Sequence, residues 1–225
     1  MVHEVCAQPG ASPVRLAIFD LDGTLIVGDS LLSFVRFVLR RVPRTLLRMP
    51  VIAGRLMGSR GRAHGVKEAV LSVIDPLTGA EQGALVDEFV ERVATTRVRP
   101  HVARLREEQA AAGRVPIVVS ASPDLYVAPL AARLGFSAAV ATRLVRRGDG
   151  GASSRIEGDN MKGPAKLRAL SAQFGGRDID WSGSFACGDR SSDRAVLDRV
   201  GEPLAVHPDG PLRVHAKTHG WRILS

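Results

Sequence analysis

The 225-residue chain carries 31 Lys and Arg against 23 Asp and Glu, a formal net charge of +8, and 45% of its residues are hydrophobic. This balance excludes a disordered chain, and a chain of this length can bury a core without disulfides. No uninterrupted apolar run reaches the roughly 18 residues of a membrane span, and the first residues show no signal-peptide pattern. The two cysteines, Cys6 and Cys187, fit neither a disulfide framework nor a zinc site. We therefore expect a cytoplasmic protein.

The first half of the chain predicts one strand followed by helices. Residues 14–19 are an apolar run that ends in the acidic stretch Asp20-Leu21-Asp22-Gly23-Thr24. Apolar residues then recur at helical spacing, and Pro43 and Pro50 are expected to restart the helix, because proline is tolerated only in a first turn. The ranges predicted to be helical in this half are 31–58, 66–75, 80–98 and 100–112.

Strands and helices alternate in the second half. Strands are predicted at 115–119, 138–142, 184–187 and 204–206, and helices at 123–134, 163–174 and 191–199. The glycine-rich residues 148–151 predict a turn that can close a hairpin, and the residues after 206 are expected to form a less regular tail. This alternation predicts an α/β fold with a doubly wound, Rossmann-like parallel sheet. The expected domains are an α/β core (11–25 and 99–225) and a helical cap inserted after the first strand (26–98).

Polar residues gather where the predicted strands end, which is where parallel sheets bind their ligands. They are Asp20, Asp22, Ser120, Lys166, Asp189 and Asp193. One carboxylate can attack phosphorus, and a second one two residues later can protonate the leaving oxygen and then deprotonate water. The remaining carboxylates can hold Mg²⁺. The Ser120 hydroxyl and the Lys166 ammonium can hold phosphoryl oxygens.

The segments FDLDGT, VVSAS, the helical Lys166 and CGDRSSD resemble, in this order, the four signature motifs of the haloacid dehalogenase superfamily. A C1-type helical cap directly after the first motif resembles the phosphoserine-phosphatase-like branch, and the resemblance covers about residues 14–207. It implies that Asp20 is the nucleophile and Asp22 the general acid/base. The residues implied to hold the substrate phosphate are Ser120, Ala121, Lys166, Gly23 and Thr24, and those implied at the Mg²⁺ site are Asp20, Asp22 (through its carbonyl), Asp189 and Asp193.

The function we expect is Mg²⁺-dependent hydrolysis of a phosphomonoester through an aspartyl-phosphate. An acid/base at Asp22 favours a phosphatase over a dehalogenase of this superfamily, because a leaving halide needs no proton. The expected substrate is a small phosphorylated metabolite, such as phosphoserine or another phosphorylated amino acid or alcohol. Two alternatives stay open: a lipid-phosphate phosphatase acting on phosphatidylglycerophosphate or lysophosphatidate at a membrane surface, and a non-catalytic regulator that binds phosphorylated ligands.

Several of these residues also have a purely structural interpretation. Ser120 and Ser122 could be helix N-caps ahead of Pro123, and we keep only Ser122 as a cap. Lys162 competes with Lys166 for the phosphate, and Asp193 could be a helix-start charge favoured by the dipole. Asp29 lies about where phosphoserine phosphatases place a Glu that holds the substrate ammonium, and it could equally cap the first cap helix.

The segment from Ser30 to Lys67 contains eight Arg and one Lys but no Asp or Glu, so it alone carries +9. The arginines on its apolar-faced helix could meet an anionic membrane surface, which would add a peripheral location at the inner membrane face. They could instead meet a polyanionic substrate, or they could be a solvated face of the cap. We expect no nucleic-acid partner, since the segment has few aromatic residues and no binding motif. Nothing in the sequence indicates an oligomeric state.

Overall fold

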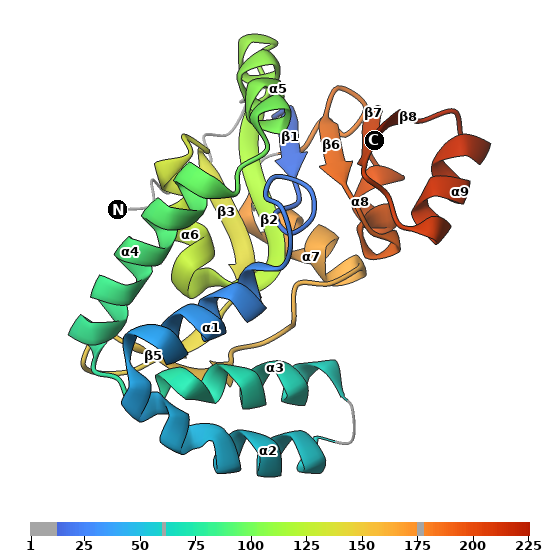
Figure 1. Cartoon of the computed structure of the whole chain (residues 1–225). Coiled ribbons are helices and arrows are strands. Elements are labelled where there is room, and N and C mark those ends of the chain that lie inside the picture. Colours follow the sequence, from blue (N-terminus) through green and yellow to red (C-terminus); the bar gives the residue numbers. More distant parts are fainter. Residues whose placement is uncertain (1–12, 60–61, 175–177) are drawn as a thin grey trace.

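A computed structural model describes residues 13–59, 62–174 and 178–225 (Figure 1). Its centre is a six-stranded sheet of order β3-β2-β1-β6-β7-β8, in which every neighbouring pair is parallel. The strands are β1 (Leu16–Phe19), β2 (Val115–Pro123), β3 (Ala138–Thr142), β6 (Phe185–Gly188), β7 (Glu202–Val206) and β8 (Arg222–Leu224). The predicted parallel, doubly wound sheet is confirmed.

Helices cover both faces of this sheet, so its central strands are apolar on both sides. Along β1, Ala17 and Phe19 belong to one apolar cluster, whereas Leu16 and Ile18 belong to the cluster on the opposite face. This is the two-residue alternation of a strand with both faces buried. The covering helices are α5 (Pro100–Ala111), α6 (Asp124–Arg133), α7 (Pro164–Gln173), α8 (Arg194–Leu197) and α9 (Gly210–Thr218).

A helical insertion, residues 30–96, lies between β1 and α5, and we call it the cap. Its elements are α1 (Ser30–Arg41), the 3-10 helix η1 (Pro43–Arg48), α2 (Met49–Gly58), α3 (Ala63–Leu71), the 3-10 helix η2 (Ser72–Ile74) and α4 (Gly79–Thr96). Pro43 and Pro50 lie in the first turns of η1 and α2, as expected for residues that restart a helix. Thr78 and Glu81 form a capping box that begins α4.

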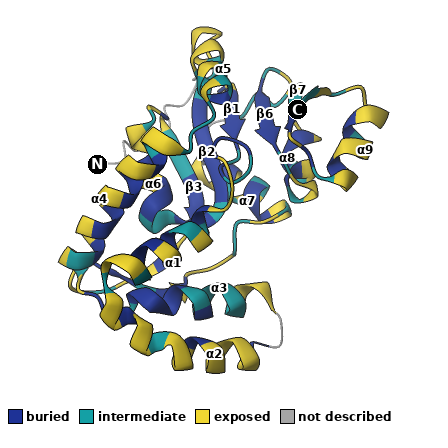
Figure 2. Ribbon diagram, in the orientation of Figure 1, coloured by how far each residue is buried: buried dark blue, intermediate teal, exposed yellow. Residues whose placement is uncertain are grey.

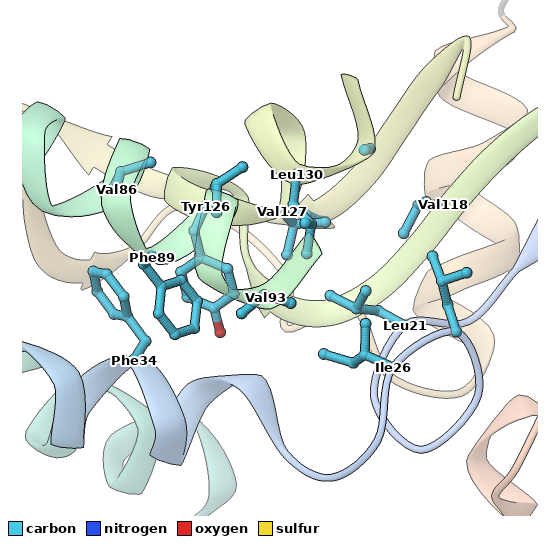
Figure 3. Packing of buried hydrophobic residues seen from close by; sticks show 14 of the residues in the cluster. Leu21, Ile26, Phe34, Val86, Phe89, Val93, Val118, Tyr126, Val127 and Leu130 are labelled. Atoms are coloured by element: carbon cyan, nitrogen blue, oxygen red, sulfur yellow. The ribbon is translucent and has the colours of Figure 1, made fainter. Parts of the chain in front are cut away.

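Aromatic side chains join the cap to the sheet-covering helices (Figure 3). The Phe34 ring of α1 lies 5.1 Å from the Phe89 ring of α4 and 4.9 Å from the Tyr126 ring of α6, measured between centroids. The apolar cluster is therefore continuous from the cap into the core. The boundaries 26–98, 11–25 and 99–225 stay a prediction.

The structure departs from the expected elements mainly near the C-terminus. The tail is not irregular: Asp209 caps α9 by accepting the Leu212 N–H at 2.8 Å, and β8 adds a parallel edge strand beside β7. The expected helix over 191–199 is shorter, a 3-10 turn (Ser191–Asp193) followed by α8.

Elsewhere the turn at 148–151 does close an antiparallel hairpin, between β4 (Leu144–Arg146) and β5 (Ala152–Ile156). Cys6, Arg60 and the first two residues of the predicted core segment 11–25 lie outside the described residues.

Candidate active site

The acidic loop after β1 meets the loop after β6 at the carboxyl edge of the sheet. The Asp20 N–H donates to the Cys187 carbonyl at 3.0 Å, which extends the pairing of β1 with β6 up to the first acidic residue. Gly23 has a φ of +85°, and a Cβ at this position would lie 2.1 Å from Oδ2 of Asp189. Only glycine allows this turn and this close approach together, so the two acidic loops can come into contact.

Lys166 of α7 lies between two carboxylates. Its Nζ donates to Oδ1 of Asp20 and to Oδ1 of Asp193, each at 2.6 Å. All three side chains are nearly buried: Lys166 is 5% exposed, Asp20 is 12% exposed and Asp193 is 6% exposed. Burial by itself would lower the pKa of Lys166, but the two carboxylates outweigh it and the net shift is upward, which keeps the ammonium protonated.

Three carboxylates converge on one point. An oxygen from each of Asp20, Asp189 and Asp193 lies within 4.8 Å of the others. Burial and, after it, the charge of Asp193 raise the pKa of Asp189 to about 6, and burial is also the largest effect raising the pKa of Asp20. An oxygen-only donor set whose charges repel one another fits a hard divalent cation such as Mg²⁺.

Within this group Asp193 has a second task. Its Oδ1 accepts from Lys166, and its Oδ2 accepts the Arg190 N–H at 3.1 Å. Both carboxylate oxygens of Asp193 therefore accept hydrogen bonds, and these bonds position Lys166 and the loop. Asp20 and Asp189 have more oxygen lone pairs left to bind a cation.

Asp22 faces a different set of partners. The Ser122 hydroxyl donates to its Oδ2 and the Ser30 N–H donates to its Oδ1, both at 2.6 Å. Burial raises the pKa of Asp22, and these hydrogen bonds oppose the rise. A carboxyl with a raised pKa that is held in one orientation is suited to giving and taking a proton.

Ser122 is a residue that sequence reasoning assigned wrongly. The N-cap of α6 is Pro123, with no side-chain cap, so Ser122 is not a helix cap. Its hydroxyl orients Asp22, and the Ser30 hydroxyl lies 3.0 Å from it and 3.1 Å from the Tyr126 hydroxyl. The serine two places after Ser120 was visible in the sequence, but nothing in the pattern indicated that its hydroxyl would face Asp22.

A cavity of about 230 Å³ opens over these groups. Its lining comprises Asp20, Asp22, Asp29, Leu31, Ala63, Lys67, Ser120, Ala121, Ser122, Asn160, Lys162, Lys166, Asp189, Arg190, Ser192 and Asp193. Of the residues predicted to hold phosphate, Ser120, Ala121 and Lys166 line this cavity. Gly23 and Thr24 do not line it, and the Thr24 hydroxyl is buried without a hydrogen-bond partner in the described protein.

The cap contributes a lysine that sequence reasoning did not single out. Lys67 of α3 donates to the Ala121 carbonyl at 2.5 Å and to Oδ1 of Asn160. Burial lowers the pKa of Lys67 to about 8, against the opposing effect of Asp22. In the sequence Lys67 is one of nine cations in a basic segment, and only the packing of α3 over the sheet edge brings it to the cavity.

Asp29 caps the first cap helix and also lies at the cavity, and its role towards a substrate ammonium stays a prediction. Its Oδ1 accepts the Leu32 N–H at 2.8 Å and so caps α1, while the residue is exposed and lines the cavity. The competing cation Lys162 also lines the cavity, whereas Lys166 alone contacts Asp20 among the described lysines.

Comparison with known proteins agrees with this geometry. The family model of haloacid dehalogenase-like hydrolases matches residues 17–198. The chain is 31% identical over 218 residues to the inhibition of morphological differentiation protein of Streptomyces azureus, covering 94% of this chain and 78% of that protein. It is 28% identical to the phosphoserine phosphatase SerB1 of Mycobacterium tuberculosis, covering 96% of this chain and 72% of that protein.

Solved structures show the same fold. A protein of unknown function from Bordetella pertussis Tohama I superposes with a TM-score of 0.81 at 26% identity, covering 95% of this chain and 99% of that one. A phosphoserine phosphatase in a phospho-aspartyl intermediate analogue state superposes with a TM-score of 0.62 at 21% identity, covering 95% and 93%. The chain therefore belongs to the haloacid dehalogenase-like hydrolases and is an enzyme of the phosphatase type.

Proposed function

We propose that this hydrolase cleaves small phosphomonoesters with Mg²⁺ by forming an aspartyl-phosphate on Asp20. The observation that carries the proposal is the contact of Lys166 with Asp20 at 2.6 Å, beside an Asp22 whose two oxygens are held by Ser122 and Ser30. A nucleophile, a phosphate-binding cation and an oriented acid thus line one cavity.

In the first step an Asp20 oxygen attacks phosphorus and the bond from phosphorus to the ester oxygen breaks. Asp22, in its protonated form, gives its proton to the leaving alkoxide. Lys166 and the Ser120 hydroxyl hold phosphoryl oxygens, where negative charge is concentrated. The raised pKa of Asp22 supports this role, because it keeps a proton available nearer neutral pH than an ordinary aspartate would.

In the second step a water oxygen attacks the same phosphorus and the bond to Asp20 breaks. Asp22 now takes the proton from that water and returns to its starting form. Inorganic phosphate leaves, and the Asp20 carboxylate is restored beside Lys166. The two proton transfers balance, so no further acid or base is required.

Asp20 and Asp189 would hold the Mg²⁺, together with the Asp22 carbonyl. When bound there, the ion supplies positive charge that screens the repulsion between the Asp20 carboxylate and the phosphoryl oxygens. Asp193 would then act on the site through Lys166.

The lining suggests a small, polar leaving group. A cavity of about 230 Å³ has room for little beyond a phosphoryl group and a short alcohol. Lys67 and Asp29 lie on its cap side, where a cation and a carboxylate could receive the carboxylate and the ammonium of a phosphorylated amino acid. Phosphoserine and related compounds are therefore the first substrates to test.

The experiment is phosphate release by the purified chain from a panel of soluble phosphomonoesters with Mg²⁺, beside the Asp20→Asn variant. We expect turnover by the wild type and a loss of about 10⁴-fold or more in the variant, since a covalent route cannot proceed without its nucleophile. Asp159→Asn is the matched control, because this exposed aspartate pairs only with Arg168 in the described structure and should leave turnover unchanged. Equal activity of the wild type and Asp20→Asn would contradict the proposal.

A lipid phosphate is the second candidate substrate, with the same chemistry. The observation that favours it is a group of exposed apolar side chains on the cap, which includes Leu47 and Met57. Including lysophosphatidate and phosphatidylglycerophosphate in the panel separates the two candidates. A chain that binds phosphorylated ligands, releases no phosphate from any of them and does not trap fluoroberyllate at Asp20 would instead be the non-catalytic regulator.

A further inference from the structure

The helix α2 exposes apolar side chains that a folded protein normally buries. Six of the ten large hydrophobic residues that are exposed in the described part of the chain lie between positions 46 and 57. They are Leu46, Leu47, Met49, Val51, Leu56 and Met57, and Leu47 and Met57 are 81% and 84% exposed. Figure 2 shows α2 at the edge of the molecule with most of its ribbon in the colour of exposed residues.

The polar side of a surface helix is missing here. Pro50, Ala53, Gly54 and Gly58 are also exposed, so Arg55 is the single charged residue of α2. A helix that is apolar nearly all round is normally buried, and an exposed apolar patch of this kind marks an interaction site. We call residues 46–58 the apolar rim of the cap.

Unpaired positive charge accompanies the apolar rim. A groove of about 450 Å³ between α1 and α4 is lined by five arginines over a floor of buried Phe37, Phe89 and Val93. The arginines are Arg36, Arg40, Arg41, Arg92 and Arg97. Arg41 pairs with Glu88, and Arg97 donates to Ser33, but Arg36, Arg40 and Arg92 have no ion pair within the described residues.

Three further cap arginines near the apolar rim have carboxylate partners within the cap. Arg44 pairs with Glu81, and Arg48 and Arg55 share Asp75, each at 3.5 Å. Arg62 has no ion pair within the described residues, but the three unpaired arginines named above lie together in the groove between α1 and α4, and η1 connects the last turn of α1 directly to the apolar rim.

We propose that the cap docks on an anionic phospholipid surface, with the apolar rim at the level of the headgroups and the groove arginines holding lipid phosphates. An apolar face beside arginines is the composition of a helix that lies in a membrane interface. A ten-residue helix is about 15 Å long, half of the roughly 30 Å hydrocarbon core, so α2 would lie along the surface. Among the described residues no helix is long and apolar enough to cross a membrane.

A second copy of the chain fits this face less well. A two-fold dimer places the same surface against itself. The residues that line the groove include no Asp or Glu, so the groove arginines of the two copies would face each other without carboxylates from the lining to pair with. A phospholipid surface supplies those negative charges.

The first experiment is sedimentation of the full chain with vesicles of phosphatidylcholine, with and without phosphatidylglycerol, at low and high salt. We expect binding to the anionic vesicles only, and loss of binding at high salt because exposed charges are screened. The double variant Leu47→Asp/Met57→Asp should bind roughly tenfold or more weakly, since two apolar side chains no longer enter the interface. Val214→Asp is the matched control, because Val214 of α9 is also exposed, at 67%, and should bind as the wild type does.

The second experiment tests the groove. Arg36→Gln and Arg40→Gln should each weaken vesicle binding about fivefold, the effect of removing one basic residue at an anionic surface. The thermal unfolding midpoints of all variants, which the exposed positions should leave unchanged, show that folding is retained.

Three results would overturn the inference. One is no binding of the wild type to anionic vesicles at low salt. Another is equal weakening by Val214→Asp and by the Leu47→Asp/Met57→Asp pair, which would show that the apolar rim has no special role. The third is a wild-type dimer in sedimentation velocity that the rim variants make monomeric, which would assign the face to a second copy. None of these results depends on which phosphomonoester the enzyme hydrolyses.

Discussion

Charged side chains form buried ion pairs at the carboxyl edge of the sheet and exposed ion pairs in the cap. At the sheet edge, Lys166 is 5% exposed and bridges two buried carboxylates at 2.6 Å. In the cap, Arg41 and Arg44 are 53% and 54% exposed and pair with Glu88 and Glu81. A buried ion pair must offset a large loss of hydration, whereas an exposed pair contributes little to folding.

The difference in burial shows which charged residues indicate a function. A buried cluster of one lysine and three aspartates is too costly to persist as a by-product of composition, and its residues are those of the proposed reaction. The exposed pairs of the cap explain part of the +9 segment without any function. Within the described part of that segment Arg36, Arg40 and Arg62 have no ion pair. Arg36 and Arg40 line the groove together with the unpaired Arg92 of α4, and these groove arginines are the charges that need a partner.

The sharpest test of this contrast removes one cation from a buried pair and one cation from an exposed pair. Lys166→Met leaves Asp20 and Asp193 buried without their cation, so we expect the metal-free protein to lose about 3–5 kcal/mol of unfolding free energy and phosphatase turnover to disappear. Arg133→Met, which removes an exposed partner of Glu91, should leave the denaturation midpoint unchanged. Urea unfolding of both variants in the presence of a chelator measures the difference. Similar losses in the two variants would remove the distinction between buried and exposed pairs.

Metal binding should depend on pH through Asp189. Because folding raises the pKa of Asp189 to about 6, the folded state holds this proton more tightly than the unfolded chain. Burial of the charged carboxylate and, after it, repulsion from Asp193 therefore destabilise the metal-free protein above pH 6. This destabilisation fades as the pH falls towards the ordinary value of 3.8. At neutral pH, Mg²⁺ at a hundredfold excess over its Kd should add about 2.7 kcal/mol to the free energy of unfolding. Below pH 6 this gain should become progressively smaller, because the ion must displace the proton of Asp189.

Thermal unfolding with and without Mg²⁺ across this pH range is the measurement. Asp189→Asn should abolish the metal effect, and Asp159→Asn, which alters an exposed aspartate paired with Arg168, should keep it. A Mg²⁺ effect that stays constant from neutral pH to well below pH 6 would show that Asp189 does not hold the ion.

The smallest of these effects concerns the hydroxyl that orients Asp22. Ser122→Ala removes one donor to the charged form of Asp22, which should raise the pKa of Asp22 further and move the alkaline limb of the kcat/KM profile, set by loss of the Asp22 proton, to higher pH. A hydrogen bond to a charged group is worth about 1.5 kcal/mol, so turnover should fall roughly tenfold. Thr95→Ala is the control, because its hydroxyl contacts only carbonyls of its own helix. A lower rate with an unmoved pH profile would assign Ser122 a packing role.

Much of the fold could be predicted because local patterns agree with the tertiary structure. The strand at Leu16–Phe19 is apolar without interruption, and a strand of this kind has to be covered on both faces. The tail was predicted wrongly because α9 contains polar and charged residues among few apolar ones, so its helical period is weak. It forms a helix since Asp209 caps it and Leu212 and Ala216 are buried against the sheet.

The amino-acid sequence alone predicted the residues of the proposed reaction centre, since Asp20, Asp22, Lys166 and Asp189 follow from spacing, strand ends and motif resemblance. Only the tertiary structure decided which side chains contact those residues. It turned Ser122 towards Asp22, brought Lys67 from the cap into the cavity, paired half of the described cap arginines and left the apolar rim exposed. The physical reason is that spacing along the chain records local geometry, whereas these contacts join residues 20 to 100 positions apart, and only packing brings such residues together.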